Sequence, residues 1–363
     1  MKIVTVVGAR PQFVKAAAIS RAIRTEFSSG IQEVLVHTGQ HYDKNMSDVF
    51  FDELDIPRPN YNLEISGGNH GAMTGRMLES IEKVILQESP DWLLIYGDTN
   101  STLAGALAAA KLHVPVAHVE AGLRSFNMRM PEEINRILSD RVSKLLFCPT
   151  DTAVQNLASE GVRAGVHNVG DVMYDVALFF RDKARESSGA MVRLGLRGRE
   201  FALATCHRAE NTDDPVKLKS ILAGLAAVAE RMPVVLPLHP RTRKLARDYR
   251  LESYLDQLMV VDPLPFLDMV ALEQAAQVIL TDSGGVQKEA FFFQVPCITL
   301  REETEWVETV SSGWNTLVGS DSNRIRDAFD MLRQGEGTRR VGTPYGNGNA
   351  SKRILELLVN ELS

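Results

Sequence analysis

The chain has few cysteines and no long apolar run, which argues against a disulfide-rich protein and against a membrane protein. Its 363 residues include only Cys148, Cys206 and Cys297, widely spaced and without a C-x-x-C pair. This pattern excludes a disulfide framework and is typical of a reducing compartment. No stretch reaches the roughly 18 apolar residues of a membrane-spanning helix, and the N-terminus lacks the apolar region of a signal peptide. We therefore expect a cytoplasmic protein that does not bind a membrane.

Excess positive charge and the common metal and phosphate motifs are also absent. The formal net charge of −6 argues against a nucleic-acid partner. H-E-x-x-H, D-x-D and the Walker lysine motif do not occur, so we expect no metal. The turn after the first apolar run reads Gly8-Ala9-Arg10-Pro11 rather than G-x-G-x-x-G, which makes a dinucleotide site a weak interpretation.

Short apolar, β-branched runs alternate with helical patterns along the whole chain. The length suits two domains, and the alternation predicts an α/β fold with two doubly wound, parallel-sheet (Rossmann-like) domains. We place the first domain at residues 1–170 plus 346–363 and the second at 171–345, with the polar stretch Glu186–Glu200 as a link. Within the first domain, a helix beginning at Pro131 is expected to turn an apolar face toward the core, formed by Ile134, Ile137, Leu138 and Val142.

The stretch Val278–Phe293 contains a glycine-rich turn. A buried run is broken by Asp282-Ser283-Gly284-Gly285, and helical spacing then resumes. A strand, a glycine turn and a helix together point free backbone N–H groups at an anion. Glu289 lies farther along that helix, where it could accept hydrogen bonds from sugar hydroxyls. An ordinary βα turn explains the pattern equally well by itself.

Polar side chains follow the predicted strands in both halves. The first half supplies Arg10, Lys15, Asp98, Glu120 and Glu132, and the second His207, Arg208, His239, Ser283 and Glu289. Parallel sheets bind ligands at the carboxyl ends of their strands, so we expect a site in a cleft between the two domains. Neighbouring carboxylates raise one another's pKa, which suits one acid and one base. Helix capping or ordinary surface charge is the alternative for each residue alone.

The ordered set of these motifs resembles the non-hydrolysing UDP-N-acetylglucosamine 2-epimerase family. The resemblance spans nearly the whole chain and is carried by G-A-R-P-Q-F-V-K, H-T-G-Q-H, Y-G-D-T-N-S-T, H-V-E-A-G-L-R, M-P-E-E-I-N-R, C-H-R-A-E-N, L-T-D-S-G-G-V-Q-K-E-A, T-E-W-V-E and P-Y-G-N-G. It implies a glycosyltransferase-B-like architecture in which the last helix returns to the first domain. It also implies a cytoplasmic homodimer.

The resemblance further implies a mechanism without a cofactor. UDP leaves carbon 1 of the sugar as the proton on carbon 2 is removed, and UDP then adds back to the enzyme-bound glycal. The family's catalytic residues fall on Asp98, Glu120, Glu132 and His207. Its substrate-binding residues fall on Arg10, Lys15, Arg136, His239, Ser283, Gly284, Gly285, Glu289 and Arg301. The expected role is the supply of an epimerised nucleotide sugar for bacterial surface polysaccharide.

Three departures from the family pattern concern the sugar. The chain reads A-R-P-Q-F where many members have T-R-P-E, and T-E-W-V-E where they have T-E-R-P-E; the segment between Glu120 and Glu132 is also shorter. We therefore keep UDP-2,3-diacetamido-2,3-dideoxy-glucuronic acid as an alternative to UDP-N-acetylglucosamine. Arg124, Arg129 and Arg301 are then candidates for binding its carboxylate. A UDP-sugar glycosyltransferase is the alternative from another reaction class.

Overall fold

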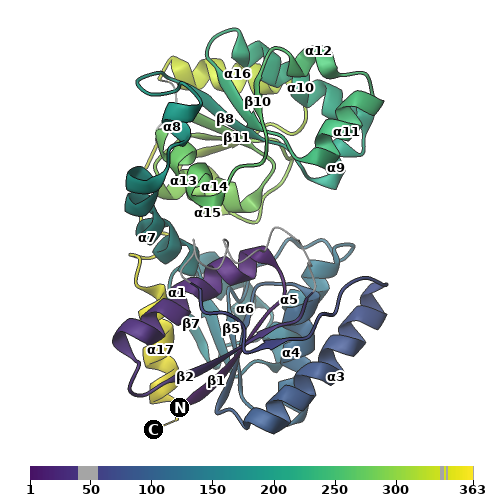
Figure 1. Cartoon of the computed structure of the whole chain (residues 1–363). Helices are drawn as coiled ribbons and strands as arrows, with labels where there is room; N and C mark the ends of the chain where they lie inside the picture. The colour runs from purple at the N-terminus through teal and green to yellow at the C-terminus, as the bar shows by residue number, and fades with distance from the viewer. Residues whose placement is uncertain (40–55, 336–338, 341, 363) are drawn as a thin grey trace. The chain divides into compact units, whose positions relative to one another are not determined.

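The computed structural model describes residues 1–39, 56–335, 339–340 and 342–362, so the end of the H-T-G-Q-H motif lies outside the described residues. The chain divides into two compact units: Met1–Leu178 with Thr343–Ser363, and Phe179–Gly342 (Figure 1). The terminal helix α17 (Ala350–Asn360) therefore belongs to the first unit. It packs against α1 (Arg10–Glu26), where Lys352 Nζ lies 2.7 Å from Glu26 Oε2.

The first unit is built on a sheet of seven parallel strands. They are ordered β3-β2-β1-β4-β5-β6-β7. Their bounds are β1 Lys2–Val7, β2 Gln32–His37, β3 Tyr61–Asn62, β4 Trp92–Tyr96, β5 Val116–Val119, β6 Leu145–Cys148 and β7 Val166–Asn168. Every residue of β4 is buried, as expected of a parallel strand with both faces covered. Chain connections run outward in both directions from the neighbouring strands β1 and β4, which makes the gap between them the topological switch point.

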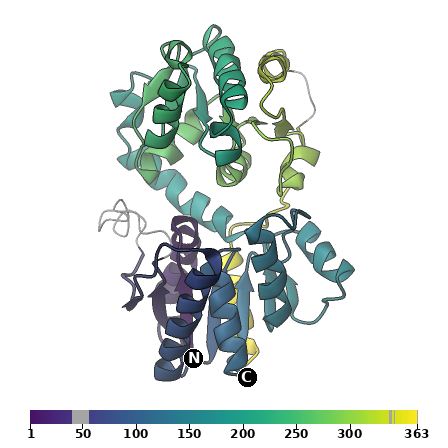
Figure 2. The same ribbon diagram turned by 90° about the vertical axis from the view of Figure 1, so that its right-hand side faces the viewer.

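Helices cover both faces of this sheet (Figures 1 and 2). Besides α1 and α17 they are α3 His70–Glu88, α4 Asn100–Lys111, α5 Pro131–Val142, α6 Asp151–Ser159 and the start of α7 Val172–Ser187. The apolar sides of α3 and α4 share one core with β1, β2 and β4. Thr99 caps α4 through its hydroxyl, which accepts a hydrogen bond from Thr102 N at 3.3 Å. The cap starts the helix directly after Asp98.

The predicted orientation of α5 is wrong. Ile134, Leu138 and Val142 are 41%, 43% and 36% exposed, respectively. The buried side of the helix is polar instead, with Glu133, Asn135, Arg136, Ser139 and Asp140. The apolar residues have the predicted helical spacing, but the buried charged and amide side chains of this helix are tied into hydrogen-bond and ion-pair networks within the unit. Those networks outweigh the burial of one apolar stripe.

The second unit has six parallel strands in the order β10-β9-β8-β11-β12-β13. They are β8 Ala202–Thr205, β9 Val234–Pro237, β10 Met259–Val261, β11 Val278–Thr281, β12 Cys297–Thr299 and β13 Asn315–Leu317. If the strands of each unit are numbered from its own first strand, the two orders are the same, except that the described part of the second unit has no counterpart of β7. The switch point therefore lies between β8 and β11. The prediction of two parallel, doubly wound sheets is confirmed.

The helices of the second unit include several short ones. They are α8 Ala190–Arg193, α9 Ala209–Thr212, α10 Pro215–Ala229, α11 Pro240–Asp248, α12 Glu252–Leu255, α13 Phe266–Ala275, α14 Gly284–Phe292, α15 Val307–Ser311 and α16 Ser322–Arg333. The stretch Glu186–Glu200, interpreted as a polar link, contains α8. That prediction missed Ala190 and Leu196, which are buried in the core of this unit.

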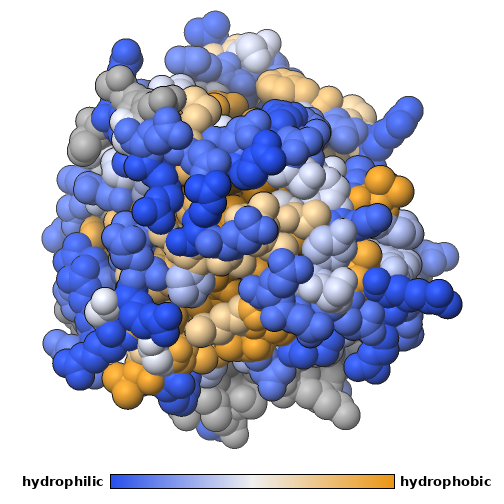
Figure 3. Space-filling view, turned by 90° about the horizontal axis from the view of Figure 1, so that it is seen from above, coloured by the Kyte–Doolittle hydropathy of each residue, from blue (hydrophilic) through white to orange (hydrophobic). Residues whose placement is uncertain are grey.

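The molecular surface is largely hydrophilic on the face shown in Figure 3, where polar residues surround a band of apolar ones. Within the described part of the chain, no helix combines the length and apolar character needed to cross a membrane.

Candidate functional site

The predicted site residues follow the strands that flank the two switch points. In the first unit, Arg10 and Lys15 come after β1 and Asp98 comes after β4. In the second unit, His207 comes after β8 and Ser283 after β11. This is where doubly wound sheets bind their ligands, because the strand connections diverge there and leave the carboxyl edge open. Each unit therefore brings its own group of predicted residues to one edge of its sheet.

Glu120 and Lys15 form an ion pair at the edge of the first unit, between Lys15 Nζ and Glu120 Oε2. Both side chains are largely buried. Glu120 has a φ of 72°, a left-handed conformation that a non-glycine residue adopts at a cost of roughly 1–3 kcal/mol. Gly97 lies beside the pair, and a Cβ there would be 3.2 Å from Glu120 Oε2 and 3.5 Å from Lys15 Nζ. The glycine thus leaves room for the carboxylate and the ammonium group to meet.

Asp98 is held by two residues of α5. Arg136 Nη2 donates to Asp98 Oδ2 at 2.5 Å, and Asn135 Nδ2 donates to the Asp98 carbonyl at 2.9 Å. Burial raises the pKa of the Asp98 carboxyl, and the charges of Glu120 and Glu132 add to that shift, against the opposing effect of Arg136 and Lys15. An acid whose pKa is moved toward neutrality suits proton transfer.

Glu132 and Arg10 are the two exposed members of the first group. Glu132 lies in the first turn of α5, close enough to Asp98 for its charge to raise that residue's pKa. Arg10 is the first residue of α1. Both side chains thus leave their charged ends accessible to a ligand at this edge.

Gln12 is a residue of this edge whose role sequence reasoning missed. Its Oε1 accepts from Gly8 N at 2.8 Å and Ala9 N at 3.1 Å, and its Nε2 donates to the Tyr96 carbonyl at 2.6 Å. The amide therefore joins the turn after β1 to the end of β4, across the switch point. The side chain must both accept and donate, which explains an amide where a carboxylate is usual in the A-R-P-Q-F motif.

His118, on β5, contacts residues at the same edge of the sheet through both nitrogens of its ring. Its Nδ1 lies 2.7 Å from Asp140 Oδ1 and its Nε2 lies 2.7 Å from the Gly97 carbonyl oxygen. The His118 and Asp140 side chains are completely or almost completely buried. Although burial raises the pKa of the Asp140 carboxyl, His118 and Arg124 outweigh burial and hold that pKa below its usual range. This network connects the residue before Asp98 with β5, which ends directly before Glu120.

Arg124 belongs to that network, and the prediction that it binds a substrate carboxylate is wrong. Its Nη1 donates to Asp140 Oδ2 at 2.7 Å. Its Nε and Nη2 donate to the two oxygens of Glu160 at 2.7 and 2.8 Å. The Arg124 side chain is 1% exposed, so the guanidinium is already committed to two protein carboxylates.

At the edge of the second unit, the Asp282 carboxylate binds several residues of the loop after β8. This role was not predicted from the sequence. Its fully buried carboxylate accepts hydrogen bonds from His207 N at 3.0 Å, Arg208 N at 3.0 Å and Asn211 Nδ2 at 3.2 Å. His207 Nδ1 lies 3.7 Å from Asp282 Oδ1, and the His207 side chain is 50% exposed. Asp282 therefore fixes the loop after β8 while leaving the imidazole accessible.

The glycine turn after β11 starts α14. Ser283 caps the helix, its hydroxyl accepting from Val286 N at 3.5 Å. A Cβ on Gly284 would lie 2.9 Å from Glu305 Oε1 and 3.1 Å from Trp306 Nε1, so an added methyl group would have to displace these side chains. Gly285 is exposed, and a Cβ on it would come no closer to the protein than 3.8 Å, to Ser283 Oγ. Its backbone is thus open to a ligand at the positive end of the helix.

The remaining predicted residues of the second unit are Arg301, Glu289 and His239. Arg301, which is 8% exposed, follows β12 and donates from Nη1 to Glu305 Oε2 at 3.1 Å. Glu289 lies within α14, and its charge helps to raise the pKa of the Glu273 carboxyl, an effect secondary to the burial of Glu273. His239 is exposed and caps α11, its Nδ1 accepting from Arg241 N at 3.2 Å.

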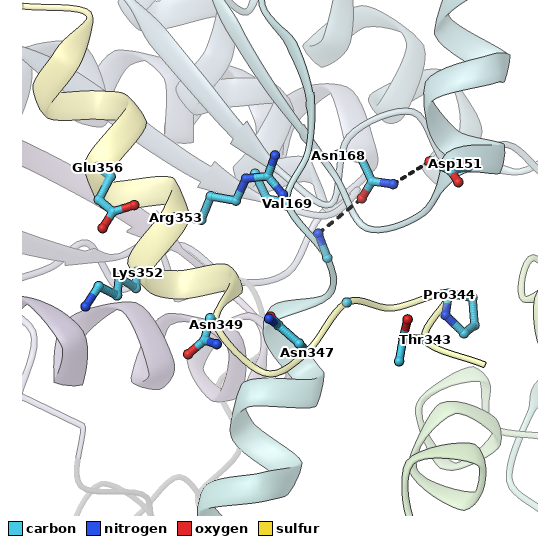
Figure 4. A pocket seen from close by; sticks show the side chains of 12 residues that line it. Asp151, Asn168, Val169, Thr343, Pro344, Asn347, Asn349, Lys352, Arg353 and Glu356 are labelled. Carbon is cyan, nitrogen blue, oxygen red and sulfur yellow. Dashed lines mark hydrogen bonds between the residues drawn. The ribbon is translucent and has the colours of Figure 1, made fainter. Parts of the chain in front are cut away.

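A polar pocket of about 780 Å³ lies elsewhere in the first unit, where the loop after β7 meets the start of α17 (Figure 4). Asn168 Nδ2 donates to Asp151 Oδ1 at 2.6 Å on its wall, and Arg353 projects from α17. None of the predicted site residues lines it, so pocket volume alone does not locate the site. Over the residues described, no three His, Cys, Asp or Glu side chains are grouped as a metal ion would require.

Two sheets of Rossmann-like strand order, each with polar groups at its switch point, are typical of α/β proteins that bind nucleotides. A family model described as UDP-N-acetylglucosamine 2-epimerase matches residues 24–359. The chain belongs to this family, whose members are isomerases.

Relatives along the full length agree with that assignment. The chain is 55% identical over 362 residues to the UDP-2,3-diacetamido-2,3-dideoxy-D-glucuronate 2-epimerase of Pseudomonas aeruginosa, covering 99% of each. It matches the crystal structure of Methanocaldococcus jannaschii UDP-GlcNAc 2-epimerase in complex with UDP-GlcNAc and UDP at 41% identity and a TM-score of 0.89, covering 99% of this chain and 100% of that one. The Neisseria meningitidis UDP-GlcNAc 2-epimerase bound to UDP-GlcNAc matches at 31% identity, with the same TM-score and coverage.

Proposed function

We propose that this protein epimerises carbon 2 of a UDP-sugar by eliminating UDP and adding it back. The observation that carries the proposal is the cluster of Asp98, Glu120 and Lys15 at the switch point of the first unit. It places two carboxylates of different environment at one edge, one paired with an ammonium group and one with a raised pKa. Such a pair suits removal of a proton on one face of the sugar and its return on the other.

The second unit supplies the groups that suit the leaving UDP. The first turn of α14, with Ser283 and the open backbone of Gly285, offers N–H donors to a diphosphate. His207 carries an accessible imidazole on a loop fixed by Asp282. Preorganised donors of this kind stabilise a developing anion by about 3–4 kcal/mol each, and we assign the departing UDP to them. Glu289 is proposed to bind the ribose, and Arg10, Arg136, His239 and Arg301 complete the proposed substrate contacts.

We infer that the sugar is a 2,3-diacetamido-2,3-dideoxy-glucuronate. The 55% identity to an enzyme named for that substrate supports the inference, as does the departure of T-E-W-V-E from the more frequent T-E-R-P-E. UDP-N-acetylglucosamine is the second candidate, because structurally similar enzymes at 41% and 31% identity have been solved with it bound. With Arg124 committed elsewhere, Arg129 and Arg301 remain the candidates for the uronate carboxylate.

The test is to assay both UDP-sugars side by side in deuterium oxide. We expect deuterium at carbon 2 together with the epimer, and a higher kcat/KM for the diacetamido uronate. Active protein that produces the epimer without deuterium would overturn the elimination mechanism. A higher kcat/KM for UDP-N-acetylglucosamine would reverse the choice of substrate. Free UDP released in proportion to an acceptor sugar would indicate a glycosyltransferase instead.

We also propose that the enzyme is a homodimer in the cytoplasm, supplying surface polysaccharide synthesis. The exposed residues Ile134, Leu138 and Val142 are spaced four apart along α5, and a second copy would cover them. Leu138→Lys should then shift the protein from dimer to monomer in analytical ultracentrifugation, while Leu86→Lys, at an exposed residue of α3, should not. An unchanged dimer in the Leu138 variant would exclude this face.

A further inference from the structure

Glu133 is a buried carboxylate that the family pattern leaves without a role. It is 1% exposed and lies one residue after the predicted catalytic Glu132. Its Oε2 accepts from Ser125 N at 2.9 Å and Ser125 Oγ at 3.0 Å, and its Oε1 accepts from Phe126 N at 2.9 Å. One carboxylate therefore holds two consecutive residues of the segment between Glu120 and α5.

The same carboxylate shares a guanidinium with Asp98. Arg136 Nη1 donates to Glu133 Oε2 at 2.8 Å, while Arg136 Nη2 donates to Asp98 Oδ2 at 2.5 Å. The Arg136 side chain is 9% exposed. Because the guanidinium is planar and its donors are fixed relative to one another, the position of Glu133 constrains the position of the group that binds Asp98.

The backbone that Glu133 holds is strained. Phe126 has a φ of 58° and a side chain that is 77% exposed, so packing of its ring contributes little to keeping it there. An aromatic residue in the left-handed region costs free energy, which the surrounding contacts must offset. The hydrogen bond from Phe126 N to Glu133 is such a contact, so the shape of this segment and the placement of Arg136 depend on one side chain.

We propose that Glu133 is a positioning residue for epimerisation: it orients Arg136 on Asp98 and ties that contact to the segment at residues 125–126. The inference rests on the proposed role of Asp98. Glu133 touches neither the substrate nor the reacting atoms in this scheme. It divides the charge of Arg136 between two carboxylates and so limits how far that charge stabilises ionised Asp98.

Because Glu133 and Asp98 share the charge of Arg136, replacing Glu133 should shift the pH profile of kcat in a predictable direction. The charged groups around Asp98 are Arg136 and Glu132 of α5, Lys15 of α1, and Glu120 after β5. Glu133→Gln removes the anion that competes for Arg136, while the other four groups keep their charges. The pKa of Asp98 should fall, and the limb of the kcat profile that reports Asp98 should move to lower pH. Loss of the fixed geometry should also lower kcat about tenfold, with KM changed much less.

Glu79→Gln is the matched control, because it removes the same charge from an exposed residue of α3. It should leave both the pH profile and kcat unchanged. Glu133→Asp is the second variant: it keeps the charge but withdraws the carboxylate by one methylene, so kcat should fall without a shift of the limb. If circular dichroism shows that Glu133→Gln does not fold, Glu133→Asp still tests the proposal through its kcat.

Glu133→Gln with a wild-type profile, a limb moved to higher pH, or Glu133→Asp with wild-type kcat would each overturn the proposal. Failure of the proposed function is a different result, because wild-type protein would then not epimerise either UDP-sugar.

Discussion

The two units share a strand order, but different interactions organise the edge of each sheet at which the strands' carboxyl ends lie. The first unit buries ion pairs there: Lys15 with Glu120, Arg136 with Asp98 and Glu133, and the chain from His118 through Asp140 and Arg124 to Glu160. The second unit has the ion pair of Arg301 with Glu305, but its edge depends mainly on backbone N–H groups, which converge on Asp282 and line the start of α14.

The difference matches the demands of the two proposed tasks. Proton transfer needs carboxyl groups with adjusted pKa values, and neighbouring charges and burial adjust them. Holding a diphosphate needs fixed donors, and backbone N–H groups at a helix start provide them. A doubly wound sheet thus decides where a ligand is bound, and the side chains and turns at its edge decide what happens to it.

The largest predicted effect is a loss of activity when the acids of the first unit are replaced. Asp98→Asn and Glu120→Gln should each lower kcat for epimerisation by about 10³-fold, because each removes a proposed proton-transfer group. UDP affinity, measured by titration calorimetry, should stay within about twofold because the diphosphate donors lie in the second unit. Comparable loss of UDP affinity in both variants would refute the division of tasks.

The buried anchors of the two edges should differ in their contribution to stability. Asp140→Ala leaves His118 and Arg124 without their shared carboxylate, and breaking such a buried network costs about 3–5 kcal/mol. Asp282→Asn keeps an acceptor for its mainly neutral donors and should cost about 1–3 kcal/mol. Urea unfolding of the two variants measures both values, and an equal or reversed order would contradict the comparison.

Within the second edge, the two glycines should separate folding from binding. Gly284→Ala places a Cβ against Glu305 and Trp306, so it should lower both the melting temperature and UDP affinity. Gly285→Ala meets open space, so it should weaken UDP binding about tenfold without changing the melting temperature. A Gly285 variant that binds UDP normally would show that the ligand does not approach this backbone.

The smallest predicted effect is a gain in stability from loss of an acid. The folded protein raises the pKa of Asp98, so ionised Asp98 destabilises the fold at pH values above its ordinary pKa near 3.8. Asp98→Asn should therefore melt about 2–4 °C higher at pH 7. The advantage should disappear as the pH falls below the ordinary pKa, where Asp98 is protonated in both states. A variant less stable than wild type at pH 7 would show that the ion pair with Arg136 outweighs burial.

Much of the fold was predictable, because buried parallel strands appear as short apolar runs that tertiary contacts do not disguise. Trp92–Tyr96 and Leu145–Cys148 are such runs, and every residue of both strands is buried. The strands β3, β7 and β13 were missed, since each has only two or three residues and one of them is an asparagine, so none forms an apolar run. α8 was missed because its polar surroundings resemble a linker.

The candidate site was predictable as a set of residues but only partly as a set of interactions. Asp98, Glu120 and His207 were singled out because polar groups at strand ends are informative. Gln12, Asp282 and Glu133 were not assigned their roles, because each acts through partners distant in sequence or through the backbone. Arg124 was misassigned for the same reason: its commitment to Asp140 and Glu160 is invisible without the tertiary structure.

The alternation of strands and helices, the glycine turn at Ser283 and the order of motifs that marks the family can all be predicted from the amino-acid sequence. These features depend on local preferences: apolar runs form strands, and glycine allows close backbone approach. Which charges neutralise one another and which face of α5 is buried become visible only in the folded chain. Those outcomes depend on how strands from distant parts of the chain are ordered in each sheet, and on the free energy of burying charge only where a partner is in reach.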